Sequence, residues 1–289
     1  MSDSAAILHD IVTELEDVEF FDRVAERLLP LVDDMTRSPR VKRILSGTPL
    51  GHRLHPMLTD VPIGCWSASS FLDVTAWRNS ERSARRLTAI GILAALPTIA
   101  TGLSDWRDTQ RRSRRLGLVH MASNVAGLAF EVAAWNARRR GRHGQGAVLG
   151  MFGLAASSAA GFLGGHLVFA ERAGVDVEVP VVDDNDWHAV CRLDELADRQ
   201  PTVVAVGMAR VVVVRAGAAT YASAAPCTHQ GGPLHEHPLR DGVLTCSWHG
   251  SQFCVTDGRV ARGPATAALP TYETREHDGF VEVRNRRTD

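Results

Sequence analysis

The sequence predicts a chain of two parts, a bundle of four transmembrane helices followed by a small all-β domain. Four apolar segments of nearly membrane-spanning length occupy the first part, and arginines flank each of them. After Arg172 the composition changes to short β-branched runs separated by Gly, Asp or Pro, which is typical of strands. Two glycine-rich loops that contain cysteine and histidine interrupt these runs.

The N-terminal stretch predicts one amphipathic helix over residues 4–33. Apolar side chains such as Ile7, Ile11 and Leu15 recur at helical spacing, and Asp and Glu fill the gaps. Because its polar face is acidic, it is a poor match to an anionic lipid surface. We expect it to pack on the protein's own surface or on a partner, and we assign residues 1–36 to it.

The transmembrane domain is predicted over residues 37–175. Its composition, rich in Ala, Gly, Ser and Thr, also suits a buried bundle in a soluble protein. The flanking arginines and the length of the last segment, 26 uncharged residues, favour the membrane. The connections are short, so the helices should alternate in direction. The predicted spans are residues 56–77, 87–104, 116–136 and 145–170.

This alternation brings several histidines to one membrane face, together with Asp105. They can hold haem b or a metal ion, form a quinone or proton site, or serve structure through hydrogen bonds to Asp60, Asp105 or Asn124. The sequence leaves these alternatives open. The histidines are His52, His55, His120 and His166.

The opposite face receives Asp73 and Glu131, for which the loop arginines predict ion pairing. Five basic residues lie between the N-terminal helix and the first span, which favours an N-in, C-in arrangement. We therefore expect a multi-pass protein of the bacterial cell membrane with its all-β domain in the cytoplasm.

Part of the membrane region resembles an uncharacterised family of four-helix bacterial membrane domains. The resemblance rests on the Gly-His-x-x-His-Pro sequence at residues 51–56, on Gly102-Leu-Ser-Asp105-Trp106, and on Gly164-Gly165-His166. It implies the same topology, and that family is sometimes fused to iron–sulfur domains. It implies no reaction.

The two loops of the all-β domain carry a Cys-x-His and a Cys-x-x-His motif, with sixteen residues between them. Two thiolates and two imidazoles suit either a tetrahedral zinc or a two-iron cluster with mixed ligands. The one-residue gap in the first motif is tighter than usual zinc spacing, and nearby glycines let backbone N–H groups approach sulfur. The four candidate ligands are Cys227, His229, Cys246 and His249.

These motifs resemble the Rieske [2Fe–2S] site, in which two cysteines hold one iron and two histidines hold the other. The resemblance covers residues 185–285 and assigns residues 176–289 to the domain. Gly232 and Trp248 stand where respiratory Rieske proteins have extra cysteines, so the site resembles the ferredoxin type and implies a low potential. The resemblance also implies that Ser251 hydrogen-bonds the cluster and that Pro264 lies in a third, shielding loop. We expect the two imidazoles to be exposed as the electron exit.

Strands are predicted at six places, and a short helix or turn at residues 193–198. No regular cysteine framework is present, so Cys65, Cys191 and Cys254 are expected to be free thiols in a reducing compartment. The predicted strands are residues 175–182, 203–214, 219–222, 242–246, 252–255 and 279–283.

Together these features indicate a membrane-anchored electron carrier or oxidoreductase subunit more than a stand-alone enzyme. Nucleic acid is an unsuitable partner, because the 289-residue chain balances 32 basic with 33 acidic residues. The leading hypothesis relays single electrons between haem or quinone at the membrane and a redox protein partner. The alternatives are a tethered ferredoxin that serves a soluble oxygenase or reductase, and a redox-sensing membrane protein. A homo-oligomer is a further candidate assembly.

Overall fold

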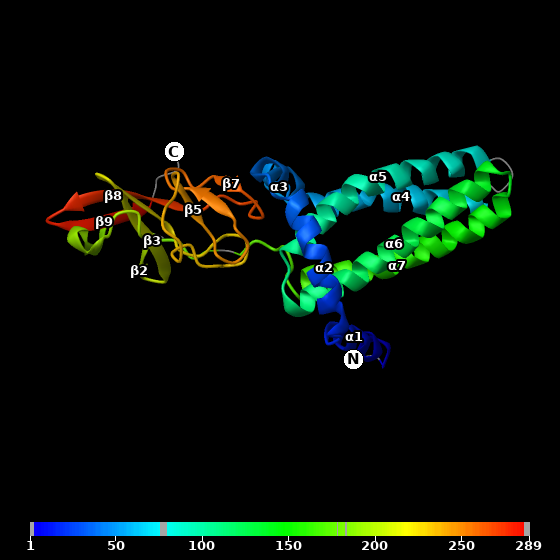
Figure 1. The fold of residues 1–289 in the computed structure, drawn as a ribbon, viewed down its shortest axis with the longest axis horizontal. Coiled ribbons are helices and arrows are strands. Elements are labelled where there is room, and N and C mark those ends of the chain that lie inside the picture. The colour runs from blue at the N-terminus through cyan, green and yellow to red at the C-terminus, as the bar shows by residue number, and fades with distance from the viewer. Residues whose placement is uncertain (1–2, 76–79, 178, 183, 286–289) are drawn as a thin grey trace. The chain divides into compact units, whose positions relative to one another are not determined.

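The computed structural model of the protein describes residues 3–75, 80–177, 179–182 and 184–285. Helices occupy the first part and strands the second, which confirms the predicted fold class (Figure 1). The helices are α1 (Asp3–Glu16), α2 (Phe20–Met35), α3 (Pro39–Leu45), η1 (Thr48–Leu50), α4 (Leu54–Thr75), α5 (Glu81–Arg107), α6 (Arg111–Arg139), α7 (His143–Phe169) and η2 (Leu193–Glu195). The strands are β1 (His188–Arg192), β2 (Thr202–Val206), β3 (Ala209–Ala216), β4 (Ala219–Ala224), β5 (Val243–Thr245), β6 (Gln252–Cys254), β7 (Val260–Arg262), β8 (Thr271–His277) and β9 (Phe280–Asn285).

The chain divides into two compact units that do not follow the order of the sequence. The helical unit contains Met1–Met35 and Leu54–Ala173, and the β unit contains Thr36–Arg53 and Gly174–Asp289. The short helices α3 and η1 therefore belong to the β unit. Thr48 Oγ1 donates to the carbonyl of Ala265 at 3.0 Å, and α3 packs on β7.

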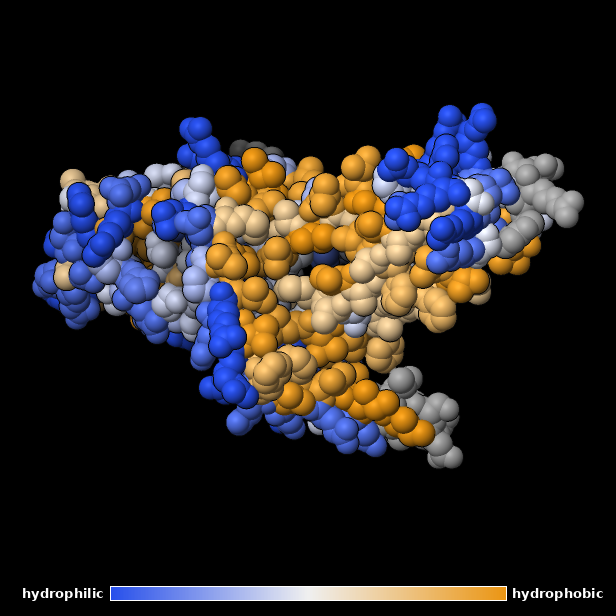
Figure 2. Space-filling model, turned by 45° about the vertical axis from the view of Figure 1, so that its right-hand side comes forward, coloured by the Kyte–Doolittle hydropathy of each residue, from blue (hydrophilic) through white to orange (hydrophobic). Residues whose placement is uncertain are grey.

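In the helical unit α4 packs beside α5, and α6 packs beside α7 (Figure 1). Small residues permit this close approach, since a Cβ at Gly127 would lie 2.6 Å from Ser157 Oγ. Three helices of the described chain, α5, α6 and α7, are long and apolar enough to cross a membrane. Figure 2 shows hydrophobic residues over much of the face of this unit in view. Residues 76 and 77, at the end of the first predicted span, lie outside the described part.

The N-terminal helix predicted over residues 4–33 is wrong as a single element, because the helix breaks between Glu16 and Phe20. The break lets each half bury its own apolar face. Val12 of α1 packs with Leu116 and Leu163, whereas α2 packs around Trp106. The predicted packing on the protein's own surface is confirmed.

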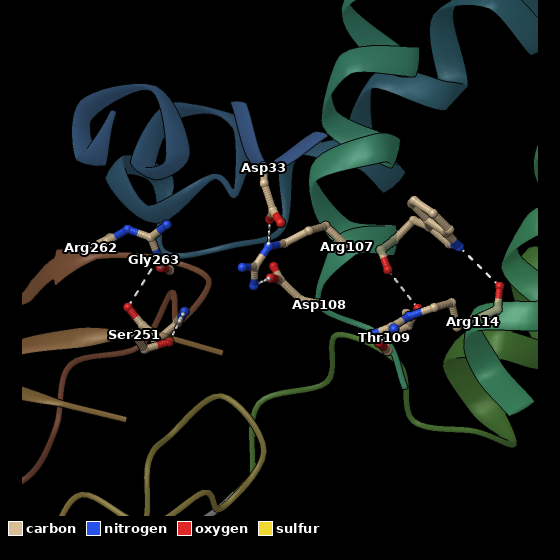
Figure 3. A network of polar contacts seen from close by, with 11 residues as sticks. Asp33, Arg107, Asp108, Thr109, Arg114, Ser251, Arg262 and Gly263 are labelled. Carbon is tan, nitrogen blue, oxygen red and sulfur yellow. Dashed lines mark hydrogen bonds and ion pairs between the residues drawn. The ribbon is translucent and has the colours of Figure 1, made fainter. Parts of the chain in front are cut away.

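Salt bridges tie α2 to α5 and α6 near the α5–α6 connection. Arg107 Nε donates to Asp33 Oδ1 at 2.7 Å, and its Nη1 lies 3.4 Å from Asp108 (Figure 3). Arg115 pairs with Asp22 at 2.5 Å. Inside the bundle Arg138 is buried and pairs with Asp73 at 2.5 Å, as the loop arginines predict.

The β unit contains a six-stranded antiparallel sheet in the order β1-β9-β8-β4-β3-β2 and a three-stranded sheet in the order β5-β6-β7. The predicted strand over residues 203–214 is in fact the hairpin β2–β3, because Gly207 takes a positive φ of 56° at its turn. The described residues within 175–182 form no strand, so that prediction is wrong. Strands β1, β7 and β8 were not predicted, since exposed charges and turn residues obscure their alternation.

Candidate metal centre

The two cysteines of the loop motifs form a buried pair. Cys227 follows β4 and Cys246 follows β5, and both lie in the apolar core of the β unit. The hydrogen bond from Cys227 lowers the pKa of the Cys246 thiol to about 7, and the backbone N–H groups of Trp248 and His249 act in the same direction. The same bond, with burial, raises the pKa of Cys227. The pair therefore ionises readily at one sulfur, which suits metal binding.

The two histidines of the motifs lie edge to face, with ring centroids 4.9 Å apart. His229 is 1% exposed and His249 is 5% exposed, so the prediction that both imidazoles are exposed is wrong for this structure. Nε2 of His229 has no hydrogen-bond partner in the described part of the chain. At least one nitrogen of that ring is therefore available as a ligand.

Basic residues of Thr36–Arg53 explain part of the environment of His229. Burial, together with the smaller effect of the charges of Arg53, His249 and Lys42, lowers the pKa of His229 to about 2. Arg53 Nε donates to the carbonyl of Gly174 at 3.3 Å, which fixes it within the β unit. The sequence places residues 37–53 in the predicted transmembrane domain, and their basic character is the signal of a role beside the site.

Glycine and backbone contacts shape the two loops around the sulfurs. A Cβ at Gly232 would lie 2.7 Å from Cys246 Sγ and 3.0 Å from the Trp248 ring, so only glycine fits there. Cys227 N donates to the carbonyl of Gly232, and Cys246 N donates to that of Ser251. The loops thus form a cradle that a side chain at Gly232 would fill.

The third loop lies against the second. Ala265 N donates to Ser251 Oγ at 3.1 Å, directly after Pro264. Arg262 Nη1 donates to the carbonyls of Gly250 at 3.1 Å and Gly263 at 3.2 Å (Figure 3). Ser251 also hydrogen-bonds Cys227 and lowers its pKa. Ser251 therefore connects the third loop to the thiol pair, while Trp248 is 52% exposed at the rim.

The predicted membrane histidines divide into different environments. His55 and His120 lie together, with ring centroids 6.4 Å apart, and each places Nδ1 on a backbone carbonyl of a neighbouring helix, Thr98 at 3.0 Å and Ala160 at 2.8 Å. Asn124 donates to His120 Nε2 at 3.1 Å, as one predicted alternative requires. His166 instead lies 3.5 Å from a carboxylate oxygen of the N-terminal helix, and His52 belongs to the β unit and is exposed.

Comparison with known proteins supports both parts of the chain. Residues 186–273 match the model of the Rieske [2Fe–2S] domain, and residues 51–177 match that of a predicted membrane protein family, DUF2231. Ferredoxin CarAc of Metapseudomonas resinovorans is 35% identical over 34% of this chain and 92% of its own length. Apoptosis-inducing factor 3 of Homo sapiens is 28% identical over 41% of this chain, which spans only 20% of that protein.

Among solved structures, a complex of reduced oxygenase and oxidized ferredoxin in carbazole 1,9a-dioxygenase contains a similar chain. It is 30% identical, is covered completely, and matches 37% of this chain with a TM-score of 0.34. The two family matches fall largely within the β unit and the helical unit, respectively. The chain belongs to the Rieske [2Fe–2S] family and fuses its Rieske domain to a DUF2231 membrane domain.

Proposed function

We propose that the protein is a membrane-anchored one-electron carrier whose cluster ligands are Cys227, His229, Cys246 and His249. The observation that carries this proposal is the buried thiol pair next to a buried imidazole pair, on two adjoining loops of a Rieske domain. A [2Fe–2S] cluster held by two cysteines and two histidines exchanges one electron at a time. The donor set and the Gly232 cradle fit that group.

The residues around the site define its electrostatics. Backbone N–H groups of His229, Trp248 and His249 point at the sulfurs and favour their anionic form. Lys42 and Arg53 add positive charge beside His229, which stabilises a site that gains an electron. Burial excludes water from both imidazoles. These features suit an outer-sphere electron site better than one that binds a substrate.

The membrane side of the proposal rests on the helical unit. Helices α5, α6 and α7 are long and apolar enough to span a bilayer, and the family match is to a predicted membrane protein. The residues that bring positive charge to His229 continue directly into α4 at Leu54. The helical unit would serve as the membrane anchor, with the β unit on the cytoplasmic side as the five basic residues before the first span predict.

A tethered ferredoxin is the second candidate, because CarAc is itself named a ferredoxin and covers the same domain. In that case the imidazoles must become accessible to a soluble oxygenase or reductase. Haem b receives less support from the geometry. Asn124 already donates to Nε2 of His120, so the lone pair that a haem iron would need is engaged.

An optical and EPR comparison of the full-length protein in detergent tests this function. The dithionite-reduced minus oxidised spectrum should show broad iron–sulfur bleaching, and the reduced protein should give the EPR signal of one spin per chain. Iron and acid-labile sulfide should be equal in amount. Zinc in place of both would overturn the electron-carrier proposal. A sharp Soret difference band would restore haem to the membrane domain.

A further inference from the structure

Three side chains of metal-ligating type meet at the end of α7, within the helical unit. Glu16 is the last residue of α1, His166 lies in the last turn of α7, and Glu171 follows that helix. One ligand atom of each lies within 4.8 Å of the other two. His166 Nε2 and Glu16 Oε1 are 3.5 Å apart. The cluster joins the N-terminal helix to the membrane bundle.

Glu16 is the most buried of the three side chains. It is 5% exposed, and its Oε1 has no hydrogen-bond partner among the described residues. Burial raises the pKa of Glu16, and the nearby Glu171 raises it further. A buried carboxylate oxygen that has only an imidazole 3.5 Å away and no hydrogen bond is costly, so it favours a proton or a cation beside it.

Two hydrogen bonds hold the acidic members of the cluster in place. Ser113 Oγ donates to Glu171 Oε2 at 3.1 Å, and Arg115 Nη1 donates to the backbone carbonyl of Glu16 at 3.1 Å. The adjacent arginines pair with other carboxylates, although the charge of Arg112 still acts to lower the pKa of Glu16. Arg112 pairs with Asp17 at 3.0 Å, and Arg115 pairs with Asp22.

The fold positions Glu16 at this cluster and favours a cation there. Val12 and Leu15 of α1 pack with Leu116 and Leu163, so Glu16 is carried on a helix that is anchored one turn earlier. His166 and Glu171 lie at the C-terminal end of α7, where the helix dipole is negative and favours positive charge. The cluster therefore combines two carboxylates and the negative end of a helix dipole with a single imidazole.

We propose that Glu16, His166 and Glu171 bind one divalent transition-metal ion of the Zn²⁺ type. Imidazole nitrogen with carboxylate oxygen is a ligand set that suits such ions, and water can complete the coordination. The ion would clamp α1 to the end of α7. The orienting hydrogen bond from Ser113 to Glu171 is the outer contact that such sites commonly have.

The test uses full-length protein in detergent with its iron–sulfur site loaded, dialysed against Zn²⁺ or Co²⁺ and then desalted. Metal per chain is measured by plasma mass spectrometry, and cobalt is examined by absorption. Co²⁺ at Glu and His ligands gives weak d–d bands, whereas Co²⁺ at the Rieske thiolates adds intense sulfur charge-transfer bands. This distinction separates the proposed site from misloading of Cys227 and Cys246.

Variants Glu16→Gln, His166→Gln and Glu171→Gln should each weaken Zn²⁺ binding by at least about tenfold, since even losing an outer contact costs that much. Glu14→Gln, on the exposed side of α1, is the matched control and should bind like the wild type. One zinc per wild-type chain that disappears in the three variants supports the site. Equal binding in all four variants, or thiolate bands alone, overturns it.

Thermal unfolding gives a second readout that does not depend on stoichiometry. Without metal, Glu16→Gln should unfold at a higher temperature than the wild type, because burial disfavours the ionised carboxylate. With Zn²⁺ the order should reverse, since only the wild type gains binding free energy. If Zn²⁺ leaves the wild type unchanged, Glu16 is merely protonated and the proposal fails.

Discussion

Two pairs of imidazoles in this molecule lie edge to face, yet their surroundings differ. In the β unit His229 and His249 are 4.9 Å apart, and Nε2 of His229 keeps no partner among the described residues. In the helical unit His55 and His120 are 6.4 Å apart, and both use Nδ1 on backbone carbonyls. A pair of close histidines therefore indicates a metal site only where a ring nitrogen is not engaged in a hydrogen bond. Two thiols beside the first pair complete the contrast.

Removal of a thiol from the β unit is the most severe test of this difference. Cys227→Ser should eliminate the iron–sulfur EPR signal entirely, because an alkoxide is a poor replacement for thiolate on iron. Cys254→Ser, a free cysteine on β6, should keep the full signal. Retention of the signal in Cys227→Ser would remove Cys227 from the ligand set and leave the two histidine pairs without their main distinction.

A second test adds one methyl group beside the thiols of the β unit or beside the imidazoles of the helical unit. Gly232→Ala would place Cβ 2.7 Å from Cys246 Sγ, and Gly164→Ala would place it 3.1 Å from His120 Cε1. Each should cost about 1–3 kcal/mol as overpacking. Only Gly232→Ala should lower the iron and sulfide content, measured by colorimetric assay. Gly161→Ala, which meets open space, is the control and should change neither quantity.

The helical pair can be tested by removing a ring. His120→Leu leaves the Ala160 carbonyl and the Asn124 amide unpaired and should cost about 1–3 kcal/mol in thermal unfolding. Its iron–sulfur spectrum should remain that of the wild type. His143→Gln, which removes a partly exposed pair with Glu81, should cost about 1 kcal/mol or less. Loss of a haem band in His120→Leu would instead make the helical pair a cofactor site.

The two loops and the long apolar helices α5, α6 and α7 could be predicted from the sequence because both carry strong local patterns. The spacing of Cys and His can be recognised within each loop separately. Apolar runs bounded by arginine can be recognised without knowing any tertiary contact. The burial of the loop imidazoles was not predictable, nor were the charges of Arg53 and Lys42 beside His229, because both depend on contacts between segments that are distant in sequence. The break in the N-terminal helix is also not predictable from the sequence, because it depends on tertiary packing. Helical periodicity continues through Asp17, and only packing on two different surfaces separates α1 from α2.

The proximity of Glu16 to His166 could not be predicted from the sequence either. Alternation of the helices predicts its depth in the bundle, but Glu16 approaches it from α1, 150 residues earlier in the chain. No local spacing connects the two residues. Buried polar atoms without partners, such as Glu16 Oε1, become visible only once the fold is assembled.

A small shift in midpoint potential is expected from removing a positive charge beside the imidazole pair of the β unit. A unit charge at about 10 Å acts with about 2 kcal/mol at an effective dielectric constant of about 20. Since about 59 mV corresponds to a tenfold change for one electron, Arg53→Gln should lower the midpoint potential by some tens of mV. The sign follows because positive charge stabilises the reduced, more negative site. Protein-film voltammetry measures this shift.

Arg40→Gln is the matched control, because Arg40 lies on the exposed face of α3 and solvent screens its charge. Its midpoint potential should match that of the wild type. An equal potential in Arg53→Gln would mean that the basic residues of Thr36–Arg53 do not act on His229 in solution. The imidazole pair would then be open to a soluble partner, and the tethered ferredoxin would become the better account of the protein.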